Sequence, residues 1–224
     1  SSVDMAFNPN VGVSLFTAVN AAVVQADGNI LIGGSFSTVA GVARNRLARL
    51  NAAGVLDPAF NPNAGSWVNA LGLQTDGKII AGGFFNSMDG VARNHLARVS
   101  PTGALDVTID PNVDDHVYSL SIQGDGEILA GGLFATADGA ARSRLARFDN
   151  DAVTDSLTAT SANRLQWLRG GSAPEAQSVT FGMSVNGGVT WSELGAGVRI
   201  AGGWEKTGLA LPASCQVRAR ARVT

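Results

Sequence analysis

Residues 74–85 read QTDGKIIAGGFF, and the chain carries two close copies of this stretch. The copies are QADGNILIGGSF at 25–36 and QGDGEILAGGLF at 123–134. Their aspartates, Asp27, Asp76 and Asp125, follow one another at intervals of 49 residues. Because a fixed period of this length is typical of stacked structural units, the sequence predicts a repeat protein.

Two further motifs accompany each copy. The first reads RNRLAR at 44–49, RNHLAR at 93–98 and RSRLAR at 142–147. The second reads VDMAFNPN at 3–10, LDPAFNPN at 56–63 and LDVTIDPN at 105–112. Asp155 follows Arg147 at the spacing that separates Asp57 from Arg49, so we expect a decayed fourth copy that ends near Leu157.

Each repeat predicts a blade of four short antiparallel strands. An Asp-Gly turn pairs residues 68–74 with 78–85, and the Pro-Thr-Gly turn at 101–103 pairs 95–100 with 104–109. The strands are apolar on both faces, which suits a blade between two neighbours. We therefore predict an all-β chain of three propeller-type blades over residues 1–157, followed by a β-sandwich-like segment over 158–224.

The recurring pattern Q-x-D-G-x-I, G-G-x-F, L-A-R and L-D-x-x-F resembles the delta-60 repeat, a bacterial propeller-type repeat. The resemblance covers residues 3–157. It implies a large cell-surface or secreted protein, and it implies no catalytic residues, because the family defines none.

After Leu157 the period stops, and strands are predicted at 164–169, 178–184 and 216–223. The order of an L-x-W motif, a Thr-Trp after a Gly-Gly turn, T-G-L-x-L-P and V-R-A-R-A resembles a fibronectin type III sandwich. Cys215 takes the place of the usual aromatic residue in the sixth strand. The chain ends where the seventh strand is expected, which indicates either a truncated fragment or a strand supplied by a partner chain. The alternative is that this segment completes the blades.

Bulk composition limits the function classes. The 16 basic and 18 acidic residues give a net charge of −2, which provides no electrostatic case for binding nucleic acid. No apolar run is long enough to span a membrane. The chain starts Ser1-Ser2-Val3-Asp4 without a Met or signal peptide, so we expect a processed product or a fragment. A single cysteine does not define the redox compartment.

The repeated arginines Arg44, Arg93 and Arg142 are the candidate ligand-binding residues. Equivalent arginines at one end of a propeller would suit an anionic ligand or a glycan. The structural alternative, which we favour, pairs each arginine with an aspartate of a neighbouring blade, such as Asp57, Asp106 or Asp155. We expect Arg93 to form an ion pair or bonds to the backbone.

Other polar residues have structural explanations at hand. The oxygen-rich stretches 110–115 and 149–151 are potential calcium ligands, but Asp and Asn also form turns. We expect His95 to occupy a tolerated surface position, because arginines replace it in the other repeats, and we expect no metal site and no cofactor. The Gly-Gly pairs at 33–34, 82–83 and 131–132 suggest a bulge or a close backbone approach.

The stretch 184–191, SVNGGVTW, resembles the Asp-box hairpin of sialidases with Asn186 in place of the aspartate. The box is a turn device and is not catalytic. We therefore expect a non-enzymatic, extracellular or cell-surface structural protein. The alternatives are a lectin-like propeller that binds a glycan or another cell-surface ligand and, with less support, a sialidase-like glycoside hydrolase.

Counting blades predicts self-association. A propeller closes with about four to eight blades, and the sequence contains three recognisable units. We expect residues 3–7 to be a stray outer strand of a preceding blade. Because exposed strand edges recruit other strands, we expect a homo-oligomer, including a head-to-tail fibre. The alternative is a compact monomer of about five blades.

Overall fold

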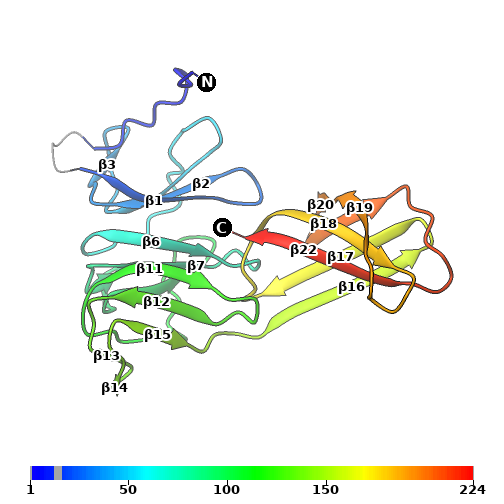
Figure 1. Ribbon diagram of the computed structural model, residues 1–224. Helices are drawn as coiled ribbons and strands as arrows, with labels where there is room; N and C mark the ends of the chain where they lie inside the picture. The colour runs from blue at the N-terminus through cyan, green and yellow to red at the C-terminus, as the bar shows by residue number, and fades with distance from the viewer. Residues whose placement is uncertain (1, 13–16, 224) are drawn as a thin grey trace.

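The computed structural model describes residues 2–12 and 17–223, and every regular element among them is a β-strand (Figure 1). Three small sheets are stacked in chain order, and the two longer sheets of the C-terminal part lie beside the stack. This confirms the predicted all-β class of propeller-type blades with a β-rich C-terminal part. In this portion of the chain, no helix is long and apolar enough to cross a membrane.

Each blade is a three-stranded sheet with a short accessory hairpin. The first blade contains β1 (Val19–Val24), β2 (Ile30–Gly34) and β5 (Leu47–Leu50), with the hairpin β3 (Thr38–Val39) and β4 (Val42–Ala43). The second contains β6 (Val68–Leu73), β7 (Ile79–Gly83) and β10 (Leu96–Val99), with β8 (Ser87–Met88) and β9 (Val91–Ala92). The third contains β11 (Val117–Ile122), β12 (Ile128–Gly132) and β15 (Leu145–Phe148), with β13 (Thr136–Ala137) and β14 (Ala140–Ala141).

The Asp-Gly hairpins form as predicted. In the second blade, Gly77 has a φ of +81° and donates its N–H to the carbonyl of Gln74. The Asp76 carboxylate accepts the N–H of Lys78 at 3.0 Å. A residue with a Cβ resists positive φ, so glycine is required where the chain reverses between β6 and β7.

The predicted fourth strand is wrong in extent. Of the stretch 104–109, only Leu105 pairs with the sheet, through a single bridge to Val99. The chain then turns, because the Asp106 carboxylate accepts hydrogen bonds from both the N–H and the hydroxyl of Thr108. This local side-chain turn competes with strand pairing and ends it after one residue.

The Gly-Gly pairs match their predicted purpose. A Cβ on Gly33 would lie 2.7 Å from a methyl carbon of Val68, in the first strand of the next blade. The second glycine faces a carbonyl in the first strand of its own blade, as Gly83 faces that of Trp67. The first strand carries the register shift there, between Val68 and Ala70. The bulge therefore lies in the first strand, and the close approach lies in the second.

The cores of the repeat region lie between blades. One cluster joins Leu31 and Leu47 of the first blade to Ile79 of the second. The next joins Ile80 of the second blade to Ile128 of the third. Ile79 and Ile80 are neighbours in β7 and face opposite sides, so the second blade is covered on both faces, as the sequence predicts.

The C-terminal part contains two sheets that share one core. The first sheet has the order β16 (Val153–Ser161), β17 (Arg164–Gly171), β21 (Gly203–Thr207) and β20 (Val198–Ile200). The second has the order β19 (Ser192–Ala196), β18 (Ala176–Ser184) and β22 (Gln216–Val223). Trp167 and Trp204 of the first sheet pack against Phe181 of the second. The predicted strands at 164–169, 178–184 and 216–223 correspond to β17, β18 and β22.

The decayed fourth copy of the repeat is not part of a blade. The sequence places the end of the repeats at residue 157, whereas β16 begins at Val153 and pairs along its length with β17. Asp155, the last repeated aspartate, accepts a hydrogen bond from the indole N–H of Trp167. Residues 153–157 therefore belong to the C-terminal sheet.

Candidate functional site

The first two candidate arginines are buried and bound to the backbone. Arg44 is 7% exposed and donates to the carbonyls of Ala43 and Pro58. Arg93 is 8% exposed, donates to the carbonyl of Ala92 at 2.8 Å and lies 3.3 Å from the Asp110 carboxylate. This confirms the prediction for Arg93.

The third candidate arginine is exposed. Arg142 donates to the carbonyl of Ala141, and it lines an open cavity of about 320 Å³ together with Arg147, Asp110 and Asp138. Neither Arg44 nor Arg93 lines this cavity. The three arginines thus occupy the same place in three separate blades, and this cavity does not bring them together.

The repeated aspartates pair with a different arginine from the one expected. Asp57 binds Arg49, at 2.7 Å, and Asp106 binds Arg98, at 2.8 Å. Both arginines are the last residue of the L-A-R motif, on the third strand of their blade. The expected pairing with Arg44 and Arg93 was wrong because each repeat carries two or three arginines in this motif, and sequence spacing does not show which one faces the aspartate.

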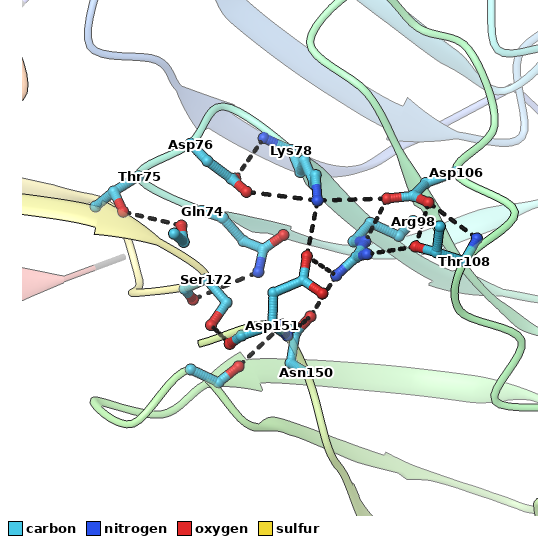
Figure 2. A network of polar contacts seen from close by, with 12 residues as sticks. Gln74, Thr75, Asp76, Lys78, Arg98, Asp106, Thr108, Asn150, Asp151 and Ser172 are labelled. Atoms are coloured by element: carbon cyan, nitrogen blue, oxygen red, sulfur yellow. Dashed lines mark hydrogen bonds and ion pairs between the residues drawn. The ribbon is translucent and has the colours of Figure 1, made fainter. Parts of the chain in front are cut away.

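Arg98 is the centre of a buried polar network that ties the second blade to the chain leaving the third (Figure 2). Its side chain is 1% exposed and binds Asp106, Thr108 and the Asn150 side-chain oxygen. The Asp151 carboxylate lies 3.0 Å from Arg98 and 2.7 Å from the Lys78 ammonium. Arg98 and Lys78 therefore hold the segment that leads into β16.

The network shifts the pKa values of its members. Burial alone would raise the pKa of Asp106, but hydrogen bonds from Thr108 and the charge of Arg98 outweigh it and lower the pKa to about 2. The hydrogen bond with Asp151 raises the pKa of Lys78, and the same bond lowers the pKa of Asp151. These charged forms stabilise one another, so the network is a structural device of the fold.

The oxygen-rich loops use their side chains within the fold. Asp114 accepts the N–H groups of Ala135 and Thr136, and Asp110 faces Arg93. In residues 2–12 and 17–223, no group of three or more His, Cys, Asp or Glu side chains is placed to hold a metal ion.

An aromatic cluster lies where the second and third blades meet, and the sequence did not indicate it. The ring of Phe84 stacks on His116 at 3.8 Å and on Trp67 at 5.2 Å, and Tyr118 meets Phe84 edge-on. Trp67 and Tyr118 are 45% and 46% exposed. A partly exposed surface of this kind suits stacking against a ligand ring. The sequence offered one signal for this cluster: aromatic residues stand at positions where the residue type varies between repeats.

His95 belongs to the same cluster and is not a simple surface residue. Its ring meets that of His116 at 5.2 Å, and its Nδ1 lies 3.2 Å from the carbonyl of Gly83. Burial lowers the pKa of His95 below 6.5. Its φ is +64°, close to the +62° of Arg46 and the +67° of Arg144. The repeat therefore conserves the backbone here and varies the side chain.

The 184–191 stretch forms a self-contained turn between β18 and β19. The hydroxyl of Ser184 accepts the N–H of Gly188, and the side-chain oxygen of Asn186 accepts the N–H of Thr190. The indole of Trp191 donates to the carbonyl of Gly188. These side chains hold the loop together, as expected for a turn device.

The outer face of the third blade is open. Leu47 and Leu96 hold equivalent positions in the first and second blades and are 0% exposed. Leu145 holds that position in the third blade and is 58% exposed. The covering element in the first two blades is the first strand of the next blade, because Val68 lies over Gly33 and Val117 over Gly82. The third blade presents the same docking surface without an occupant among the described residues.

Comparison with known protein families also identifies the repeats as propeller-type. The model of a domain of unknown function described as a beta-propeller, DUF5122, matches residues 25–60, 74–108 and 123–156. No curated protein matches the chain. Each match begins directly after the first strand of a blade and covers the second and third strands with the accessory hairpin between them, so the three blades are β-propeller-type repeats.

Proposed function

We propose that this chain is a non-enzymatic structural and interaction protein of the cell surface or the extracellular space, which self-associates through its blades. The observation that carries the proposal is the exposure of Leu145 at a position where Leu47 and Leu96 are fully covered. The repeat supplies the reason: the position that the next blade covers in the first two blades is uncovered in the third.

The complementary surface is at the other end of the stack. Val68 and Val117, in the first strands of the second and third blades, are 0% exposed against the preceding blade. The equivalent Val19 in β1 is 45% exposed. One copy of the chain thus presents both halves of a blade-to-blade contact, and we propose that β1 of one copy docks on the third blade of another. Repetition of this contact produces a ring or a head-to-tail fibre.

The proposal also includes a family for each part of the chain. We assign the repeats to the delta-60 type and the C-terminal part to a fibronectin type III-like sandwich. The sheet orders β16-β17-β21 and β19-β18-β22 support the second assignment. β22 is an edge strand in this arrangement and offers a further edge for pairing.

A lectin-like function is the second candidate, and the aromatic cluster favours it. Trp67 and Tyr118 expose ring surface beside His116, as required for stacking on a sugar ring. A glycan array with the intact chain tests it, and Trp67→Ala is expected to remove any signal. A signal that survives Trp67→Ala contradicts this site.

Light scattering over a concentration series tests self-association. We expect the mean mass to rise with concentration in the micromolar range, and Leu145→Lys to hold the chain at the monomer mass. Val198→Lys is the matched control, because Val198 is 65% exposed on the C-terminal sheet. A monomer at all concentrations, or association unchanged in Leu145→Lys, contradicts the proposal.

A further inference from the structure

An extended segment of the chain fills a slot between the second and third blades. Residues 171–175 lie along the Asp-Gly hairpin of the second blade, with Pro174 bridged to Gln74. Thr75 donates its N–H to the carbonyl of Ala173 at 2.8 Å, and Glu175 donates to the carbonyl of Leu73 at 2.9 Å. The segment therefore adds a short strand to the outer side of the hairpin.

The same segment reaches the hairpin of the third blade. Ser172 donates its hydroxyl to the carbonyl of Asp151, and a Cβ on Gly126 would collide with the Ser172 side chain. Gln74, which is fully buried, donates its side-chain amide to the carbonyl of Ser172 (Figure 2). The occupied slot thus has one hairpin that supplies hydrogen bonds and a second hairpin that forms the opposite wall.

The equivalent slot between the first and second blades is a cavity of about 500 Å³. Its lining includes the hairpin residues Gln25, Ala26 and Asp27 on one side and Gly77, the counterpart of Gly126, on the other. The N–H of Ala26 corresponds to that of Thr75, and it donates to no group among the described residues. The side-chain oxygen of Gln25 is buried and has no partner in that part of the chain, but the same holds for Gln74 and Gln123, so the N–H of Ala26 is what distinguishes the open slot from the occupied one.

The remaining wall of the cavity comes from the C-terminal part and carries two arginines and Glu175. Arg169 and Arg199 line it together with Trp204. Arg199 is paired with Glu175 at 2.7 Å, whereas Arg169 donates to the Pro174 carbonyl and lies over the Trp167 ring. An adjoining cavity of about 310 Å³ extends along Val24 and Gln177. The slot is therefore long enough for an extended chain, and its lining carries three carboxylates and three arginines.

We propose that the slot between the first and second blades is a peptide-binding site. Its occupant is an extended segment of small residues with one proline followed by an acidic residue, which pairs with the backbone of Val24–Ala26 as residues 171–175 pair with the second blade. Arg169, whose Nε is buried without a partner among the described residues, binds the acidic side chain. This site is separate from the blade face at Leu145 and does not depend on self-association.

A titration with the peptide acetyl-Gly-Ser-Ala-Pro-Glu-Ala-amide, which has the sequence of residues 171–176, tests the proposal. The readout is the NMR signals of the tryptophan indoles in the full chain, because Trp204 lines the slot. Ala26→Pro removes the N–H donor. Position 26 is the second residue of the 25–28 turn, where proline is favoured, so the hairpin is expected to survive.

We expect saturable shifts in the Trp204 indole signal and a loss of affinity of about tenfold or more in Ala26→Pro. Gly124→Pro is the matched control, since it makes the same change at the third-blade hairpin, and it is expected to leave the affinity unchanged. A peptide with Gln in place of Glu should bind several-fold more weakly. No saturable shift up to millimolar peptide, or equal affinity in Ala26→Pro, would overturn the proposal.

Discussion

The second and third blades carry the same repeat but are in different surroundings. Leu96 and Arg98 of the second blade are 0% and 1% exposed, whereas Leu145 of the third blade is 58% exposed and the Arg147 side chain 60%. Arg98 reaches Asp106 and the Asn150–Asp151 segment, while Arg147 pairs with Glu127 of its own hairpin. The repeat sequence therefore specifies the blade, and the neighbouring blade determines what each side chain contributes to stability.

The largest expected difference in the free energy of unfolding is at the apolar position that Leu96 and Leu145 share. Leu96→Ala should lower the free energy of unfolding by about 3–4 kcal/mol, because it removes buried contacts with the third blade and leaves a cavity. Leu145→Ala should change it by less than about 0.5 kcal/mol. Urea unfolding of both variants measures the contrast. Equal losses would mean that the faces of the two blades are equally covered in solution.

The repeated arginine gives a somewhat smaller contrast. Arg98→Ala should cost roughly 3 kcal/mol, because it leaves Asp106 and Asp151 without their buried cation. Arg147→Ala removes an exposed pair and should cost less than about 0.5 kcal/mol. Thermal and urea unfolding report both values. A small loss for Arg98→Ala would show that the network in Figure 2 is not a stabilising tie.

Acidification tests the same network. The folded pKa of Asp106 is about 2, below its ordinary value of 3.8. Its contribution to stability, about 2 kcal/mol, is therefore present above pH 3.8 and is lost as the pH falls toward 2. Asp106→Asn should be less stable than the unaltered chain at neutral pH, and the difference should shrink in this window. A difference that stays constant down to pH 2 would contradict the assignment.

The hairpin glycine gives the smallest expected effect. Gly77→Val should destabilise the second blade by more than about 1 kcal/mol, because valine resists a φ of +81°. Lys78→Val, next to it in the ordinary strand region, serves as the comparison for backbone strain, although it also removes the Asp151 pair. An unchanged thermal midpoint for Gly77→Val would refute the strain argument.

Sequence analysis was most successful where the period repeats. The 49-residue spacing located the blades, and the Asp-Gly and Gly-Gly positions located hairpins and close approaches. The prediction of a fourth strand was wrong because the Asp106 side chain binds the nearby Thr108, and the chain turns instead of extending the sheet. The predicted partners of the repeated aspartates were wrong because each repeat carries two or three arginines close together in sequence. β16 begins where the repeats were expected to continue, and β19, β20 and β21 are strands of three to five residues whose local sequence pattern is too weak to mark them.

The two slots were beyond sequence reasoning for a different reason. Residues 171–175 resemble a plain linker, and only the fold places them against the hairpin that ends at Gly77. The aromatic cluster around Phe84 likewise combines residues from two blades. The slots and the aromatic cluster are both formed by residues that differ between repeats, and only the stacking of the blades determines which of these residues meet.

A directed disulfide tests most directly whether the third blade receives the first blade of another copy. Val19 and Gly131 hold the positions of Val68 and Gly33, where a Cβ on Gly33 lies 3.2 Å from the Val68 Cβ. Disulfides need a Cβ separation of about 3.5–4.5 Å, which a small shift supplies. In a Cys215→Ser background, a chain with Val19→Cys mixed with a chain carrying Gly131→Cys should form a covalent dimer under mild oxidation. Cross-linking no faster than that between Val19→Cys and Val198→Cys would contradict the account.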